Sequence, residues 1–387
     1  MNDNDASVTK TENAPGSETV AVASTQSEPD ILVASQWKLV WWKFRKHKLA
    51  MISLAIVAVL YTTVIFAEFL APRLPRSHSS QHVYVPPQRI RFFSDGRFEL
   101  HVLRYTFERD PLSLQRIWTL NEDDVIPIGF FVRGQPYRMW GLFPAERRLL
   151  GPKNIDDPFF LMGTDGLGRD VFSRMIYSAR VSLTVGLVGV TLTFILGILI
   201  GGISGLIGGR LDNFIQRVIE IVLSIPHLPF WLALAAMVPI HWSPLQTYMM
   251  ITVILAFLSW TGLARVVRSK FLSLRDEDFV LAARLDGCSK TRLITRHMLP
   301  SFASHIIASI TLTIPGVIIG ETALSFLGLG LRPPVVSWGV MLQDAQRVAA
   351  MADHPWLLWP AAAVFVTVLA LNYLGDGLRD AADPYAS

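Results

Sequence analysis

The residue types that most often carry out catalysis or hold metals occur in this chain, but not at the spacings that such chemistry needs. The nine histidines include no His-Glu-x-x-His pair and no Cys/His cluster, so no metal site is predicted. The single cysteine, Cys288, excludes an internal disulfide and is interpreted as an inert small residue. Neither a Ser-His-Asp nor a paired-carboxylate arrangement stands out, and no phosphate-binding Gly-x-x-x-x-Gly-Lys-Ser/Thr loop occurs. We therefore predict that the chain is not an enzyme, binds no ATP and carries no cofactor.

The polar residues with the clearest functional potential lie at the end of a long apolar run. Glu321 is followed by Thr322 and Ser325, and an ionisable group inside a membrane segment is a functional candidate by default. These three residues are candidates for a translocation path, with a contact at a helix end as the equal alternative. Pro315 and Gly316 in the same run are predicted to kink or loosen a helix, which would let it bend in a gated pore.

Composition places these residues in a membrane protein. The chain has 387 residues, of which 51% are hydrophobic and only 17% charged, and its mean hydropathy is +0.39. Soluble domains carry about 25% charged residues. The net charge of +4 is unevenly distributed, since residues 1–36 hold six acids and one base. The basic residues fall beside apolar runs, which favours basic cytoplasmic loops and argues against a nucleic-acid partner.

Six membrane-spanning helices are predicted from runs long enough to cross a bilayer, which takes about 20 residues. The 44-residue charge-free run 221–264 is too long for one crossing, and its Pro and polar residues at 241–246 predict a hairpin of two spans. The other four predicted spans are 49–67, 181–209, 298–320 and 356–375. We expect an all-α membrane protein with no signal peptide.

Basic residues near the span ends set the orientation. Five lie before the first span, so the N-terminus is predicted to be cytoplasmic, and with six spans the C-terminus is too. The loop between the fourth and fifth spans is then also inside, and its bases are Arg268, Lys270, Arg275, Arg284, Lys290, Arg292 and Arg296.

The remaining segments complete the predicted organisation. Residues 1–36 are polar and are predicted to be a disordered cytoplasmic tail, followed by an amphipathic segment and the first span over 37–71. Residues 72–160 contain alternating patches and turn signals, which predict a small β-rich periplasmic insertion between the first two helices. The core of five further helices occupies 161–387.

The inner loop 276–300 carries the most informative pattern, DFVLAARLDGCSKTRLITRHMLP at 278–300. It reads as two short amphipathic helices, with Gly287 ending the first and Ser289 capping the second. Spacing alone leaves an ordinary solvated loop as an equal alternative. The loop residues that we select are Leu281, Ala282, Ala283, Gly287, Cys288, Leu293, Leu299 and Pro300.

This loop resembles the EAA loop of bacterial ABC importer permeases, in which Glu-Ala-Ala and a Gly precede Ile-x-Leu-Pro. The matching residues are Ala282, Ala283, Gly287, Leu299 and Pro300. Leu281 stands where Glu is usual, and His297 stands where Ile is usual. The resemblance implies the type I importer fold, in which this loop docks on a cytoplasmic ATPase and transmits its closure to the membrane helices.

Three further stretches narrow the resemblance to the dipeptide, oligopeptide and nickel importer permeases, of the second-subunit type. They are GTDGLGRDVFSRMIYSARVSL (163–183), ETALSFLGLGLRPPVVSWG (321–339) and GDGLRDAADP (375–384). The resemblance implies an inner-membrane subunit that works with a second homologous permease, two ATPase subunits and a periplasmic binding protein. It implies a peptide cargo, with oligosaccharides, opine-like compounds or nickel as alternatives.

Readings from other classes remain open at this point. A passive channel or a membrane receptor would use the same spans without ATPase partners. A membrane-embedded enzyme would need a cluster of catalytic groups inside the spans, and the sequence shows none.

Overall fold

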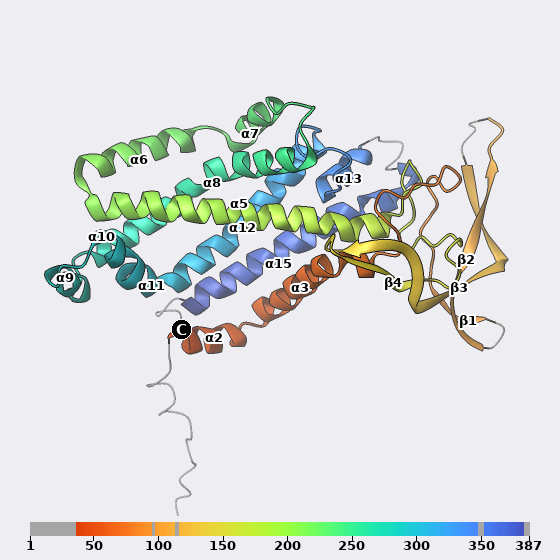
Figure 1. Ribbon diagram of the computed structural model, residues 1–387, viewed down its shortest axis with the longest axis horizontal. Helices are drawn as coiled ribbons and strands as arrows, with labels where there is room; N and C mark the ends of the chain where they lie inside the picture. The colour runs from red at the N-terminus through yellow and green to blue at the C-terminus, as the bar shows by residue number, and fades with distance from the viewer. Residues whose placement is uncertain (1–35, 95–96, 113–115, 347–351, 383–387) are drawn as a thin grey trace, which may run out of the picture. The chain divides into compact units, whose positions relative to one another are not determined.

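The computed structural model describes residues 36–94, 97–112, 116–346 and 352–382 (Figure 1). These residues form a mostly helical chain with one four-stranded sheet. The helices are α2 (Gln36–Lys46), α3 (Lys48–Ile65), α4 (Ala67–Leu70), α5 (Val171–Ile207), α6 (Gly209–Ser224), α7 (His227–Ala236), α8 (Pro244–Leu274), α9 (Asp278–Leu285), α10 (Lys290–Arg292), the π-helix η1 (Leu293–Met298), α11 (Leu299–Ser301), α12 (Ala303–Phe326), α13 (Trp338–Asp344), the 3₁₀ helix η2 (Pro355–Leu358) and α15 (Trp359–Ala382). The strands are β1 (Arg91–Ser94), β2 (Arg97–Arg109), β3 (Arg116–Met139) and β4 (Phe143–Pro152). Except for Gln36, the tail predicted over 1–36 lies outside the described residues.

Five helical segments of the described chain are long and apolar enough to cross a membrane. They are α3, α5, α8, α12 and the segment Pro355–Ala382 that joins η2 to α15. The pair α6 and α7 passes the same test only when taken together, and its two helices are bent by 84°. The break falls at Ile225 and Pro226, both extended, where proline cannot continue the helical hydrogen bonds. By length and composition, the described chain therefore has five candidate crossings, or six if the bent pair counts as one.

Helix α5 begins ten residues before the charge-free run that predicted it, at Val171 and not at Val181. The extra turns contain Arg174 and Arg180, whose charges made the sequence appear unsuitable for a span. Both arginines are paired, Arg174 with Asp165 and Arg180 with Glu68. Pairing lowers the cost of bringing a charge close to the apolar core, so the helix extends through them.

Helix α5 packs closely against α8 through small residues on one face. Gly197, Gly201 and Gly205 recur every fourth residue along α5 and face Leu263, Ala264 and Phe271 of α8. A Cβ added at Gly205 would lie 2.7 Å from Phe271 Cβ and 2.8 Å from the Arg268 carbonyl oxygen. Small residues let helix backbones approach in a membrane, where lipid gives no hydrophobic drive for association.

The stretch 72–160 holds the antiparallel sheet, in the order β1-β2-β3-β4. The first half of the long strand β3 pairs with β2 and the second half pairs with β4. Its core packs Val102, Ile126 and Ile128 against Phe159.

Side chains of this stretch and of α5 bind the segment that follows α3. Arg148 of β4 is 1% exposed and donates to the carbonyl oxygens of Glu68 and Ala71, both at 2.7 Å. Arg180 of α5 holds both carboxylate oxygens of Glu68, at 2.6 and 2.7 Å. The sheet and α5 are therefore fastened to the same short helix, α4.

We predict that Gly201→Ala destabilises the protein by about 1–3 kcal/mol, the usual cost of overpacking. The added methyl would collide with the carbonyl oxygen of Ala264, a backbone atom that cannot turn aside. Gly262→Ala on α8 is the matched control, because its Cβ would meet no atom within 4 Å. Unfolding of the purified variants in detergent measures the difference, and equal stability of the two would contradict the packing argument.

Candidate functional site

The loop between α8 and α12 folds as a helix, a tight turn and a second helix. Helix α9 ends in a Schellman motif: Cys288 N donates to the Ala283 oxygen at 3.1 Å, and Gly287 N donates to the Arg284 oxygen at 3.0 Å. Gly287 has φ +72°, which a residue with a Cβ adopts only with strain. Ser289 then caps α10, since its Oγ accepts from Arg292 N. The predicted helix break at Gly287 and the predicted cap at Ser289 are confirmed.

One face of this loop packs into an apolar cluster under α8 and α12. Val280, Ala283 and Leu293 are buried there, with Cys288 and Leu299 half-buried at its edge. The surrounding residues come from α8 and from the start of α12, and they include Leu263, Val267, Phe271, Phe302 and Ile306. The loop is therefore packed against these two long helices and is not a free linker.

The opposite face of α9 presents apolar side chains outward. Phe279, Leu281 and Leu285 are 43%, 42% and 89% exposed. Among the other predicted loop residues, Ala282, Gly287 and Pro300 are exposed as well. The selected residues thus divide into a buried set that holds the loop and an exposed set that is free to bind a partner.

Glu321 lies in the interior of the helix bundle, near the opposite end of α12. Its side chain is fully buried and accepts hydrogen bonds from Ser325 Oγ at 2.8 Å and Ser182 Oγ at 3.2 Å. Ser182 Oγ in turn accepts from Trp338 N at 3.1 Å. The carboxylate therefore joins α12 to α5 and, through Ser182, to α13.

The other candidates on α12 are spread around the helix. Thr322 is 9% exposed, Pro315 is buried, and Gly316 is exposed with no atom within 4 Å of its Cβ position. Helix α12 continues through Pro315 from Ala303 to Phe326. The structure thus gathers Glu321 and Ser325 into one contact and leaves Gly316 apart.

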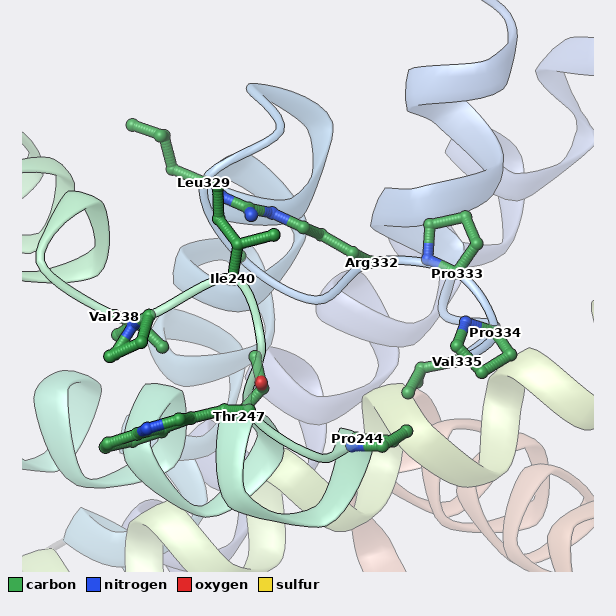
Figure 2. Close-up of a pocket in the computed structure, with 12 residues that line it drawn as sticks. Val238, Ile240, Pro244, Thr247, Leu329, Arg332, Pro333, Pro334 and Val335 are labelled. Carbon is green, nitrogen blue, oxygen red and sulfur yellow. The ribbon is translucent and has the colours of Figure 1, made fainter.

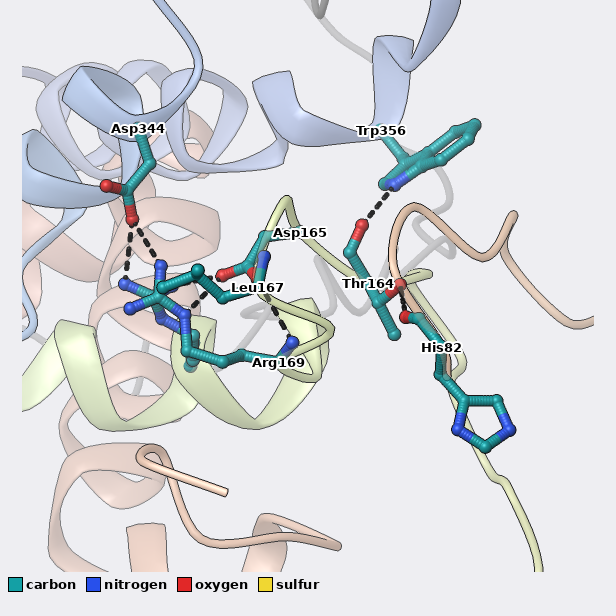
Figure 3. A network of polar contacts seen from close by, with 8 residues as sticks. His82, Thr164, Asp165, Leu167, Arg169, Asp344 and Trp356 are labelled. Carbon is teal, nitrogen blue, oxygen red and sulfur yellow. Dashed lines mark hydrogen bonds and ion pairs between the residues drawn. The ribbon is translucent and has the colours of Figure 1, made fainter. Parts of the chain in front are cut away.

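A charged network joins the start of α5 to the end of α13 (Figure 3). Asp165 pairs with Arg174, which is 2% exposed, and its Oδ2 lies 2.7 Å from Arg169 Nε. Both arginines also reach Asp344 Oδ2, at 3.1 Å from Arg174 and 2.8 Å from Arg169. Two acids and two bases therefore lock the α13 segment to the entry of α5.

A neighbouring contact ties in the segment before α15. Trp356 Nε1 donates to the Thr164 oxygen at 3.0 Å, and Thr164 Oγ1 donates to the His82 oxygen at 2.6 Å (Figure 3). Segments from three distant parts of the sequence thus meet beside the network.

The motif 163–183 was recognised in the sequence, but the pairing of its Arg169 and Arg174 with Asp344 was not predicted. No spacing rule connects residues 170 positions apart, and the only available signal was the excess of charge at a span end.

Asp170 caps the N-terminus of α5 from a fully buried position. Its Oδ2 accepts from Ser173 N at 2.9 Å, while Oδ1 has no partner within the described chain. Burial raises the pKa of this carboxyl to about 6, against the hydrogen bonds from Ser173 and the charge of Arg73 that lower it.

A cavity of about 280 Å³ opens between the α7–α8 loop and the segment after α12 (Figure 2). Its walls are mostly apolar, with Ile240, Leu329 and Val335 among them. Arg332 is the one charged residue in the lining, and its Nε donates to the Gly328 oxygen at 3.2 Å.

Comparison with known proteins gives this arrangement a family. Residues 197–386 match the family described as "Binding-protein-dependent transport system inner membrane component". Residues 35–87 match the N-terminal TM domain of oligopeptide transport permease C. The chain belongs to the binding-protein-dependent transport permeases, and it is a multi-pass membrane protein.

Individual relatives agree with the family. The dipeptide transport system permease protein DppC of Bacillus subtilis is 41% identical over 223 residues, which is 57% of this chain and 68% of that protein. The oligopeptide transport system permease protein OppC of Haemophilus influenzae is 37% identical over 246 residues, 63% of this chain and 74% of that one. A solved inward-facing structure of the MetNI methionine ABC transporter aligns at 15% identity with a TM-score of 0.43, covering 55% of this chain and 97% of that one. The predicted resemblance to dipeptide and oligopeptide permeases is confirmed.

We predict that Asp344→Asn loosens the α13 segment, because Arg169 and the buried Arg174 lose their second acid. Asp344 is 36% exposed, so we expect a loss of about 1–3 kcal/mol, in the range for hydrogen bonds to charged groups. Hydrogen exchange of Trp338–Asp344 amides should then quicken by about tenfold or more. Asp353→Asn, an exposed acid nearby, is the control. Unchanged exchange in the Asp344 variant would rule out the lock.

We predict that Asp170→Asn makes the protein more stable in a pH-dependent way, because asparagine keeps an oxygen that can cap the helix but cannot ionise. An acid whose pKa is raised in the folded state costs no stability while it is protonated, below about pH 4. The cost grows as the pH rises to about 6 and then stays near 3 kcal/mol. The variant should therefore gain stability over the wild type between pH 4 and 7, as measured by thermal unfolding in detergent. A constant difference across this range would contradict the prediction.

Proposed function

We propose that this chain is a permease subunit of an ATP-driven importer that carries di- or oligopeptides across the bacterial inner membrane. The family and the relatives named for dipeptide and oligopeptide transport support this cargo. In this proposal the chain crosses the membrane six times in the type I importer arrangement, with α6 and α7 as one bent crossing. Both ends face the cytoplasm, and the sheet β1–β4 lies in the periplasm.

The observation that carries the proposal is the two-sided inner loop. Its buried face is seated on α8 and α12, and its exposed face offers the apolar side chains of Phe279, Leu281 and Leu285. Such an exposed apolar face next to a fixed turn suits a protein partner. We assign that partner to a cytoplasmic ATPase subunit, which would bind and hydrolyse the ATP, so this chain needs no cofactor.

The rest of the mechanism follows from how the loop is attached. Closure of two ATPase subunits would push the loop, and α8 and α12 would follow because they share its apolar cluster. A second homologous permease would supply the other half of the path. A periplasmic binding protein would deliver peptide at the end that holds Glu321 and Arg332. Leu281 and Leu285 are then docking residues, and Glu321, Thr322 and Ser325 are candidates for the path.

Nickel is the less favoured cargo. Within the described part of the chain, no three or more His, Cys, Asp or Glu side chains gather in a way that would hold a metal ion.

The proposal is tested by rebuilding the importer in proteoliposomes from this chain, its sister permease, both ATPase subunits and the binding protein. We expect ATP-dependent uptake of labelled di- or oligopeptides, and little uptake of Ni²⁺ or an oligosaccharide. Uptake of Ni²⁺ alone would overturn the peptide assignment. Solute flux without ATP, or without the ATPase subunits, would instead favour a passive channel.

We predict that Leu285→Asp lowers peptide uptake and peptide-stimulated ATP hydrolysis by about tenfold or more. Placing a charge at an apolar interface removes the contact and leaves the carboxylate unpaired. Folding should be unaffected, because this side chain is 89% exposed. Leu112→Asp is the matched control, with a leucine that is 96% exposed in the turn between β2 and β3. Equal activity of the two variants would remove Leu285 from the docking surface.

A further inference from the structure

The tip of the β3–β4 hairpin lies at the end of the first crossing helix. Trp140 Nε1 donates to the Ile65 oxygen at 2.7 Å, and Ile65 is the last residue of α3 (Figure 1). Helix α3 has 18 residues and is about 27 Å long, which matches a hydrocarbon core of about 30 Å. Basic residues, Lys46 and Lys48, mark its other end. The hairpin tip is therefore held at the depth where the bilayer core meets the headgroups.

The tip exposes large apolar side chains at that depth. Trp140, Leu142 and Phe143 are 50%, 73% and 59% exposed, and the rings of Trp140 and Phe143 meet edge to face at 6.2 Å. Ile65 and Phe66 beside them are 48% and 41% exposed. Tryptophan and other aromatic residues are enriched where a membrane protein meets the headgroup level.

The backbone of the tip is shaped to present an aromatic residue. Trp140 has φ +53° and Gly141 has φ +76°, in the three-residue connection between Met139 and Phe143, where Leu142 N donates to the Met139 oxygen. A bulky residue at positive φ is a genuine outlier, and such strain persists where function requires the side chain. Phe131, also an aromatic residue at positive φ, lies beside Phe69 of α4, with the rings tilted by 42° and their centroids 5.9 Å apart.

We propose that this tip, Trp140–Phe143, is a membrane anchor that inserts into the headgroup layer of the outer leaflet. The occupant is lipid, because the tip continues the surface of α3, whose most apolar stretch is only 22% buried by the rest of the chain. Arg138 at the end of β3 is exposed, and an exposed guanidinium at the headgroup level can pair with lipid phosphate. Arg148, bonded to Glu68 and Ala71, keeps the hairpin at this depth.

The test places a reporter at the tip of the complete importer in lipid nanodiscs. Leu142→Cys is labelled with an environment-sensitive fluorophore, and the signal of the native Cys288 is measured on the unmodified chain and subtracted. Leu112→Cys is the matched control, because Leu112 is also exposed, at 96% against 73% for Leu142, but lies near the other end of β3.

We expect lipids with brominated acyl chains to reduce the emission at position 142 at least twofold, with a blue-shifted spectrum, and to leave position 112 unchanged. Equal emission at position 142 in brominated and ordinary lipid overturns the anchor. If the emission is equal in both lipids and the spectrum is red-shifted, water covers the tip. If the emission is equal and the spectrum is blue-shifted, protein such as the sister permease covers it.

Discussion

The C-terminal end of α3 has to satisfy its last backbone carbonyl groups, for which the apolar core of a bilayer would offer no hydrogen-bond donors. Two side chains from later in the sequence supply donors to α3, and a third supplies them to the segment just beyond. Arg180 of α5 donates to the Val64 oxygen, and Trp140 donates to the Ile65 oxygen. Arg148 serves the Glu68 and Ala71 oxygens just beyond. Because helix carbonyls carry partial negative charge, two arginines at this end are also electrostatically favoured.

The same constraint governs the few charged side chains near the other span ends. Asp212 of α6 holds Arg268 of α8 through two contacts of 2.5 Å, at the end of the bundle nearest the inner loop. At the far end, Asp165 and Asp344 share Arg174. The pairs Asp212–Arg268 and Arg174–Asp344 join segments that are 56 and 170 positions apart in the sequence, so both help to fix how the helices pack.

The crossings were predictable from the sequence because a bilayer demands long apolar runs, and α3, α8, α12 and α15 lie near the predicted ranges. The start of α5 was not predictable, because its arginines were counted as charges without the acids that neutralise them. The bend of 84° between α6 and α7 could not be predicted, because the angle depends on packing that a single sequence does not record.

The inner loop was read correctly at Gly287 and Ser289, because caps and turns depend on neighbouring residues alone. Which side chains lie on its buried face and which on its exposed face was not predictable, since Leu285 and Leu293 are the same residue type. Their different exposure, 89% and 2%, follows from which side of the loop meets α8 and α12. The contact of Trp140 with Ile65 was not predictable either, because the two residues are 75 positions apart in the sequence.

Helix α12 links the inner loop to the far end of the bundle. It begins beside the loop's apolar cluster, where Phe302 and Ile306 pack, and carries Glu321 near its other end. Glu321 accepts from Ser182 of α5, whose Oγ accepts from Trp338 of α13. A displacement of α12 therefore either breaks the hydrogen bonds of the buried Glu321 carboxylate or moves its partners as well. Breaking them is costly, because the buried carboxylate would be left without partners. These buried contacts therefore tie α13 to both α12 and α5.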